Sequence, residues 1–463
     1  MKESLFSSFK PTSKEDWLSQ VEKDLGGTPY ADLQWKVTGS IAMEPYYTAP
    51  EVADPRVADI QRCQKRQPGW LTQPVVYFTT PKDTNTQIHK ALSAGADAVW
   101  LQVRGQQRVG TDLHKTLHNI RLTDTPVVFE VEGNVADLTH ELLQVSGYHL
   151  KGGMAADAVA SWMLTGQDYR PAVDQLAAVV ARTNDMPAFR PLMVSGHAYH
   201  EAGAHVVQEL ACTLASAVWY LDQLTEAGLS ARQVVSKLYF SLSIGSDYLT
   251  EIAKLRALRY LYRRVTDAYG LPAEAAPAYI HARNSAFYDA PVTPHTNMLR
   301  ATSEAMSATV GGCDALTIHA YDATYRQSSS FSERIARNVS LILKEEGYMD
   351  KVADPAAGAH FIETLTLQLA DEAWTLFQRI EQDGGIVAAF EKGWIQSEIE
   401  KEWNAKTEAL TNGKVMVGVN RYRVEEPGER AEVPVPVAST QTLAELPAGF
   451  PLLVKRQLAA AIA

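Results

Sequence analysis

The sequence predicts an α/β protein built as a closed (β/α)8 barrel, the TIM-barrel fold, preceded by an N-terminal arm. Short apolar runs alternate with longer stretches of helical periodicity along most of the 463 residues, which is typical of βα units with parallel strands. The number of apolar runs is close to the eight strands of such a barrel. The chain lacks the GxGxxG and GxxxxGK[ST] motifs that would favour an open nucleotide-binding sheet.

An N-terminal arm is predicted over residues 1–45, which precede this alternation. Residues 14–25 have the pattern of a short amphipathic helix, with Ser13 as its N-cap and Asp16 in its first turn. Its apolar stripe consists of Trp17, Leu18, Val21 and Leu25. A lone helix of this length is only marginally stable in water, so we expect it to pack on the barrel or on a partner chain. The arm is therefore a candidate subunit-interface element.

The barrel is predicted over residues 46–423, including the helices that trail it. Strands are expected at 75–78, 98–103, 127–131, 191–194, 238–245, 278–287 and 315–322, the last two with the loop that follows. Helices are expected at 84–96, 112–119, 136–147, 155–166, 170–184, 206–228, 247–270, 295–312, 332–347, 361–385 and 387–410. The basic residues within 254–264 would form a solvated or salt-bridged helix face, or meet an acidic partner. Residues 424–463 are rich in proline and lack periodicity, which predicts a linker or tail outside the core.

Composition and charge restrict the class of partner and the compartment. The formal net charge of −11 argues against nucleic acid and anionic membranes as partners. The sequence contains no run of about 18 apolar residues, so no membrane span is predicted. The N-terminus lacks the apolar core of a signal peptide. The cysteines are few, odd in number and without metal-ligand spacing, which fits a reducing environment. The sequence thus predicts a cytoplasmic protein.

The loop after the strand at 191–194 is crowded with polar residues. His197, His200, Glu201 and His205 follow this strand, and active sites of barrels lie in such loops. The HEAGAH sequence superficially resembles the zinc-protease motif HExxH, but its histidines are five residues apart instead of four and would face different sides of a helix. We therefore expect no metal site here, and polar groups that hydrogen-bond to the backbone of the turn.

Two further strands end in polar residues on the same predicted face of the barrel. His281 and Arg283 belong to one of them, and His319, Asp322 and Arg326 follow the other. A polar pair such as His281 and Arg283 at this face favours contact with a ligand over a purely structural role. No Ser-His-Asp order and no pair of carboxylates with catalytic spacing stands out.

Seven blocks of the sequence, taken in order, indicate a family. They read SGHAYHEAGA, EIAKLRALRYLYRRV, IHARNSAF, NMLRATSEAMSATVGG, FSERIARNVSLILKEEG, VADPAAGAHFIETLT and VGVNRYR. Together they resemble the barrel region of methylmalonyl-CoA mutases, over roughly residues 70–423. This resemblance implies a barrel that threads the CoA arm of its substrate along the axis. It also implies adenosylcobalamin on a separate C-terminal domain, with the cofactor carrying the radical interconversion of succinyl-CoA and methylmalonyl-CoA.

Departures from the family's catalytic chains fall at the positions that carry this chemistry. The catalytic histidine falls on Ala198, and Trp70 stands in place of a tyrosine that helps drive the radical step. In the block that contacts the cofactor, His319 replaces an asparagine and Ala323 replaces a glutamate. Residues 155–169 show no match to the arginine that grips the substrate carboxylate. Together these losses indicate that this chain has no catalytic residue of its own.

Substrate and cofactor contacts are reduced in the same way. In the family's THxQTSGW block only the histidine survives, as His281, and Arg283 replaces the glutamine, so this pair is predicted to be a vestigial substrate site. The segment DLHKTL at 112–117 approaches the DxHxxG pattern that supplies the lower ligand of cobalamin, but Leu117 stands where glycine is needed. No cobalamin domain is expected in this chain, as in a trimmed or a naturally shortened small subunit.

The resemblance therefore implies the small, non-catalytic subunit of a heterodimeric methylmalonyl-CoA mutase of propionate metabolism. No cofactor would be bound by this chain, and adenosylcobalamin would lie on the catalytic large subunit. Two alternatives stay open at this point. The chain could be an autonomous acyl-CoA mutase or lyase that uses His197, His200, His281 and Arg283, or a CoA-ester-binding module with a vestigial pore.

Overall fold

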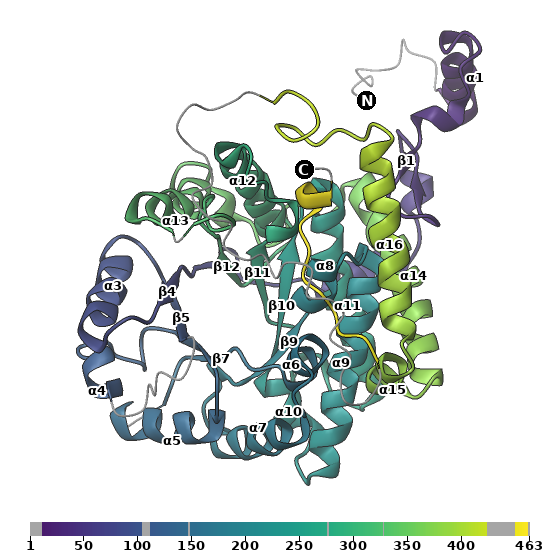
Figure 1. Ribbon diagram of the computed structural model, residues 1–463. Helices are drawn as coiled ribbons and strands as arrows, with labels where there is room; N and C mark the ends of the chain where they lie inside the picture. Colours follow the sequence, from purple (N-terminus) through teal and green to yellow (C-terminus); the bar gives the residue numbers. More distant parts are fainter. Residues whose placement is uncertain are drawn as a thin grey trace, which may run out of the picture.

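The computed structural model describes residues 12–103, 112–146, 149–275, 277–326, 328–423 and 450–461, and Figure 1 shows the barrel that they form. The strands are β1 (Trp35–Lys36), β2 (Ala42–Met43), β3 (Leu71–Thr72), β4 (Val75–Tyr77), β5 (Val99–Val103), β6 (Val127–Val131), β7 (Gly152–Met154), β8 (Phe189–Arg190), β9 (Leu192–Ser195), β10 (Leu238–Ile244), β11 (Ile280–Asn284) and β12 (Ala315–Thr317). The first helices are α1 (Lys14–Asp24), α2 (Arg56–Cys63), α3 (Pro81–Ser93), α4 (Leu113–Thr116), α5 (Val135–Ser146), α6 (Ala158–Thr165), α7 (Arg170–Arg182) and α8 (His197–Ala202). They are followed by α9 (Val206–Glu226), α10 (Ala231–Lys237), α11 (Tyr248–Ala268), α12 (Pro294–Val310), α13 (Ser330–Glu345), α14 (His360–Gln382), α15 (Gly385–Glu391) and α16 (Trp394–Thr411).

The barrel closes because two of its strands are each interrupted by a proline, and the two halves of each strand pair in different sheets. The parallel sheets have the orders β3-β12-β11-β10-β9 and β4-β5-β6-β7-β8. Pro74 separates β3 from β4, and Pro191 separates β8 from β9. Proline has no N–H to donate, so the ladder is interrupted at each of these positions. Joined across both prolines, the two sheets form one ring of eight parallel strands, which confirms the predicted fold class.

Strand β7 is the strand that the apolar pattern missed. Its sequence begins with Gly152 and Gly153, and glycine ordinarily weakens a strand. Here a side chain has no room at either position. A Cβ on Gly152 would lie 2.1 Å from the Val127 carbonyl oxygen, and one on Gly153 would lie 2.0 Å from that of Arg190. The close approach of neighbouring backbones therefore requires glycine in this strand.

The long helix α11 is buried between the barrel and α14, and Lys254, Arg256 and Arg259 are buried with it. The expectation of a solvated basic face is therefore wrong, and its salt-bridged alternative is confirmed. Lys254 lies between Glu209 and Glu251, at 2.9 and 2.6 Å, and Arg259 contacts Asp314 at 2.8 Å. Buried cations require partners of this kind, because an unpaired buried charge is very costly.

The predicted helix of the N-terminal arm is present as α1. Ser13 and Asp16 form a reciprocal capping box, with each side chain bonded to the other residue's backbone N–H at 3.2 and 3.0 Å. Lys14 donates to the Tyr46 carbonyl at 2.9 Å, which ties the first turn to the segment below it. No residue of α1 is buried, and Figure 1 shows the helix standing away from the barrel. Its apolar stripe is thus only partly covered by the described residues.

The predicted tail is described only over Phe450–Ala461, which we call the strap. Phe450 packs against Trp162 and Phe390, with ring centroids 5.6 Å apart in both cases. Leu453 and Leu458 are also buried, so this last part of the range joins the hydrophobic core. The boundaries 1–45, 46–423 and 424–463 themselves stay a prediction. Among the described helices, none is long and apolar enough to cross a membrane.

Candidate functional site

A chain of hydrogen bonds crosses the interior of the barrel. His197 Nδ1 lies 2.6 Å from Ser243 Oγ and its Nε2 lies 2.7 Å from Ser241 Oγ. Ser241 Oγ is 2.7 Å from Nδ1 of His281, whose Nε2 is 2.8 Å from Thr317 Oγ1. Thr317 then donates to the carbonyl oxygen of Gln73 at 2.7 Å. The chain thus links the end of β9 to β10, β11, β12 and the junction of β3 and β4.

The direction of every donor in this chain follows from its last acceptor. The Gln73 carbonyl can only accept, so the Thr317 hydroxyl donates its proton to it. Thr317 Oγ1 must then accept from His281 Nε2–H. In a neutral imidazole, Nδ1 of His281 is then an acceptor for the Ser241 hydroxyl, which in turn accepts from His197 Nε2–H. Ser243 completes the chain by donating to His197 Nδ1. Both neutral histidines then carry their proton on Nε2.

Burial is consistent with neutral histidines. His197 is 6% exposed and His281 only 1%. Burial holds the pKa of both imidazoles well below its usual range, and the nearby charge of Arg283 lowers it further. This chain of hydrogen-bonded side chains therefore carries no net charge at neutral pH.

An aromatic ring from the opposite part of the ring of strands closes the interior. Trp100 of β5 stacks on His281 of β11 with centroids 4.7 Å apart. These two strands are not neighbours in the sheets, so the contact bridges the interior of the barrel. Trp100 also donates to Glu130 of β6 at 2.6 Å. Side chains of β5, β6, β10, β11 and β12 therefore occupy the space around the axis.

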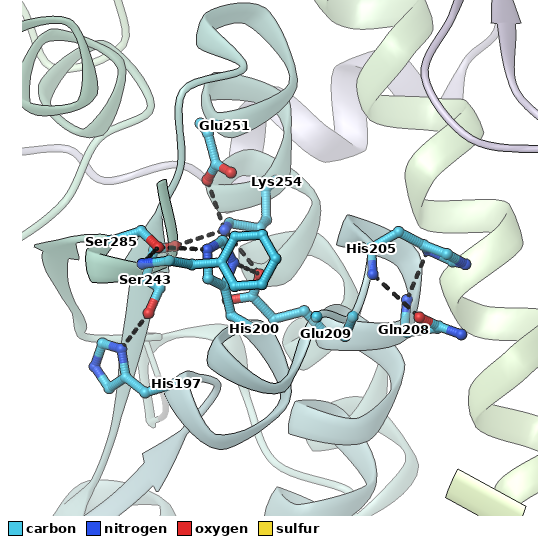
Figure 2. Close-up of polar contacts among 12 residues, drawn as sticks. His197, His200, His205, Gln208, Glu209, Ser243, Glu251, Lys254 and Ser285 are labelled. Atoms are coloured by element: carbon cyan, nitrogen blue, oxygen red, sulfur yellow. Dashed lines mark hydrogen bonds and ion pairs between the residues drawn. The ribbon is translucent and has the colours of Figure 1, made fainter. Parts of the chain in front are cut away.

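A second polar network lies beside the first, behind the loop after β9. Figure 2 shows His200 between Ser285 and Glu209, with Lys254 against the same carboxylate. His200 Nε2 is 2.8 Å from Ser285 Oγ, and its Nδ1 is 3.1 Å from Glu209 Oε2. Lys254 also donates to the Ser243 carbonyl at 2.6 Å. Burial opposes ionisation of both groups, but the surrounding charges and hydrogen bonds together outweigh it. Lys254 and His200 lower the pKa of Glu209, and Glu209 and Glu251 raise the pKa of Lys254.

Ser285, His200 and Glu209 have the connectivity of a nucleophile, a base and an orienting carboxylate. The serine is 0% exposed, however, and its hydroxyl oxygen accepts the backbone N–H of Phe287 at 3.2 Å. A nucleophile must reach its substrate, and this one is enclosed on all sides. The arrangement anchors α8 and α9 to the end of β11.

The four residues of the predicted re-tooled site are only partly brought together. His197 and His281 share Ser241, and Arg283 lies two residues beyond His281 on the same face of β11. His200 turns away from them toward Glu209, as Figure 2 shows. Arg283 lies near the C-terminal end of the barrel, with Nη2 3.6 Å from Glu201 Oε1. His281 and Arg283 thus lie along one face of β11, and His197 of α8 reaches the first of them through Ser241.

The positions aligned with family catalytic residues have structural surroundings. Ala198 is buried in α8, and the indole N–H of Trp70 donates to Ser340 of α13 at 2.9 Å. The backbone N–H of His319 donates to the Asn284 side chain at 2.6 Å, and Ala323 is half-buried in the loop after β12. Their predicted status as replaced catalytic positions stays a prediction.

No group of three or more potential metal ligands is close enough to hold an ion among the described residues. His205 instead caps α9: its Nδ1 accepts the Gln208 backbone N–H at 3.3 Å, and the Gln208 side chain accepts the His205 N–H at 3.1 Å. Burial lowers the pKa of His205 to about 4, and Lys406 acts in the same direction. Leu117 is buried at the end of α4, so this part of the DLHKTL segment serves packing.

Sequence reasoning missed the inward-facing hydroxyls that join the two histidines. Their signal was the strict alternation in β10, where Ser241 and Ser243 share one face with Tyr239 while Phe240 and Leu242 point the other way. In a closed barrel one of these faces must point inward. Knowing which polar residue each serine would meet still required the strand order.

Comparisons with known proteins agree with the resemblance seen in the sequence. The family model for methylmalonyl-CoA mutase matches residues 108–446. A relative named methylmalonyl-CoA mutase small subunit, from Porphyromonas gingivalis, is 32% identical over 91% of this chain and 71% of its own length. One of the same name from Streptomyces virginiae is 32% identical over 93% and 74%, and the methylmalonyl-CoA mutase of Cereibacter sphaeroides is 30% identical over 90% and 65%. The chain therefore belongs to the methylmalonyl-CoA mutase family.

Proposed function

We propose that this chain is the small subunit of an adenosylcobalamin-dependent methylmalonyl-CoA mutase and supports a catalytic large subunit without performing chemistry itself. The single observation that carries the proposal is the occupied barrel interior. A substrate threaded along the axis would have to displace Trp100, His197 and His281 together. The names of the two relatives that are called small subunits support the same assignment.

Displacing these side chains is energetically unfavourable. Each buried donor or acceptor left without a partner costs about 1–3 kcal/mol. Opening the axis would break a chain in which every hydroxyl and imidazole is already satisfied. A CoA arm offers amide groups to replace some of these bonds, but it cannot fit while the rings remain. This cost supports a barrel that serves as a scaffold.

With the strap in its observed position, the described residues do not fit adenosylcobalamin. Barrel proteins bind their ligands at the C-terminal rim, and part of that rim is covered by the strap, Phe450–Ala461, which contacts α6, α8 and α16. We therefore propose that the cofactor lies on the partner subunit.

The direct test is reconstitution of the complex. The full chain should copurify with a catalytic large chain of the family, and interconversion of succinyl-CoA and methylmalonyl-CoA should require the large chain and adenosylcobalamin. Turnover by this chain alone with the cofactor added would refute the proposal, and so would failure to form any complex with such a large chain.

The arm is the proposed contact with the large subunit. The half-exposed stripe of α1 includes Val21, whereas Glu22 lies on the polar side of the same helix. Val21→Asp should weaken assembly at least 10-fold in a titration of the two chains, and Glu22→Ala should have little effect. Equal affinities of both variants for the large chain would show that the arm is not part of the interface.

A second candidate, a CoA-ester-binding module, is favoured by one observation. A cavity of about 1130 Å³ opens at the N-terminal end of the barrel, and its lining includes Arg66, Arg190 and Arg263. Many of its cations are already engaged: Arg190, for example, stacks on Tyr279 at 4.3 Å. Calorimetric titration of the chain with succinyl-CoA distinguishes the CoA-ester-binding module from the scaffold. Micromolar binding that is lost in Arg190→Met but kept in the exposed control Arg170→Met would favour the module over the scaffold.

A further inference from the structure

The strap crosses the C-terminal rim of the barrel, from the loop after β7 to the loop after β11. Its first residue, Phe450, lies in the aromatic pocket of α6 and α15. Its last turn places Leu458 and Ala459 in the small apolar cluster around Phe287, which follows β11. Figure 1 shows this segment in yellow, running from α15 past α8. The face that it covers is the one where barrel proteins bind their ligands.

Midway along the rim the strap is held by charge. Lys455 Nζ lies 2.9 Å from Glu201 Oε2, and the other oxygen of Glu201 faces Arg283 at 3.6 Å. Glu201 is largely buried, with a side chain 12% exposed, whereas the side chain of Lys455 is 49% exposed. One carboxylate therefore links a cation inside the barrel mouth to a cation on the strap.

The backbone of the strap is attached far more weakly than a barrel strand. It donates to the barrel at Leu453, bonded to the Met163 carbonyl at 2.9 Å, and at Arg456, bonded to the Glu201 carbonyl at 2.7 Å. It accepts once, at the Pro451 carbonyl, from the Gln396 side chain at 2.9 Å. Only its last residues form a helical turn, Leu458–Ala461. Segments with few backbone bonds open locally without global unfolding.

We propose that the strap is a releasable lid over the C-terminal mouth, and that the Lys455–Glu201–Arg283 contact is its clasp. Its two apolar ends set where it closes, and the clasp couples closure to Arg283 inside the mouth. Release uncovers Arg283 and Glu201 while the barrel stays folded. This inference does not depend on whether the chain is a mutase subunit.

Hydrogen exchange and arginine labelling of the full chain test the lid together. In Lys455→Met the amides of Leu453 and Arg456 should exchange about 5-fold faster, and Arg283 should react faster with phenylglyoxal. Amides of α11 should be unchanged, which shows that the core remains folded. The matched control is Lys401→Met, an exposed lysine of α16 that pairs with Glu398 at 2.6 Å; it should change neither readout.

Two further perturbations keep the test decisive. Leu453→Asp places a charge in the buried contact of the strap and should open the lid more than Lys455→Met does. Raising the salt concentration screens the half-exposed Lys455 without any substitution and should accelerate labelling of Arg283 in the wild-type chain. Unchanged exchange and labelling under all three perturbations, or strap amides that exchange only together with those of α11, would show that the strap is a fixed part of the barrel.

Discussion

His197 and His200 lie three positions apart in one short helix, yet they enter networks of opposite electrostatic character. His197 joins a chain of hydroxyls and imidazoles without net charge, which ends on a backbone carbonyl. His200 joins Glu209, which is paired with Lys254. The first network fills the barrel interior, and the second ties α8, α9 and α11 to the outside of β10 and β11.

The difference shows how a barrel can keep its fold while its interior is closed. A neutral chain gains hydrogen bonds without paying for buried charge, so it can fill the axis with little electrostatic cost. A charged cluster is costly to bury and tolerates no missing member, so it belongs where helices must be fixed in place. The substitutions below test this contrast, beginning with the charged network.

Removing the cation should have the largest effect. Lys254→Met leaves Glu209 and Glu251 buried without their shared partner. We expect a loss of about 3–5 kcal/mol in the free energy of unfolding, measured by urea denaturation. Lys401→Met, at an exposed ion pair, is the control and should cost less than about 1 kcal/mol. A small effect of Lys254→Met would mean that the cluster is not an obligatory ion network.

Breaking the neutral chain at its centre should cost less. Ser241→Ala removes the donor to His281 Nδ1 and the acceptor of His197 Nε2–H at once. We expect a loss of about 2–3 kcal/mol, because two buried groups lose their partner. Ser303→Ala, at a half-buried serine of α12, provides the matched control. If both variants unfold at the same urea concentration as the wild type, the hydrogen-bond chain through Ser241 contributes nothing to stability.

Acid should act on the neutral chain through its histidines. Because the pKa of His281 is depressed in the folded state, its contribution to stability is present above the ordinary pKa of about 6.5 and is lost as the pH falls below it. Between pH 7 and pH 5.5 the wild type should lose about 1 kcal/mol more than His281→Gln does. The measurement is urea denaturation of both proteins at each pH. Parallel pH profiles would contradict a neutral buried imidazole.

An effect of similar size is expected at a buried carboxyl close to the charged network. Both oxygens of Glu304 are buried without a hydrogen-bond partner among the described residues. Burial raises the pKa of Glu304 well above its usual value, and Asp289 and Glu251 raise it further against the opposing charge of Arg300. Stability is then lost as the pH rises above the ordinary glutamate range of about 4.3. Glu304→Gln should gain about 1 kcal/mol at pH 8 and nothing at pH 4 in thermal unfolding; a loss at pH 8 would contradict this reading.

The fold was accessible to sequence reasoning because its signals are local. Period-2 and period-3.6 patterns identified most strands and helices, and Ser13 with Asp16 marked the start of α1. The strand at Gly152–Met154 was not predicted because its glycines are required by the close approach of neighbouring strands, which the local sequence does not show. The burial of Lys254 and Arg259 in α11 escaped for a related reason: their partners Glu209 and Asp314 are far away in the sequence.

The candidate site could be predicted only as a list of residues. His281 and Arg283 were expected on the barrel face from their place after an apolar run, and β11 holds both on one side. What they contact could not be predicted. His281 meets Ser241, Thr317 and Trp100, which come from three other strands, and Arg283 meets a carboxylate shared with the strap.

By itself the sequence determined the class of fold and the family, because these depend on residue identity and local periodicity. Only the tertiary structure decided that the axis is occupied and that the strap lies over the C-terminal rim. Both depend on contacts between residues that the chain brings together only when the barrel closes. The hydrogen-bond direction of His197 illustrates the point, since it is set by the carbonyl of Gln73, more than a hundred residues away.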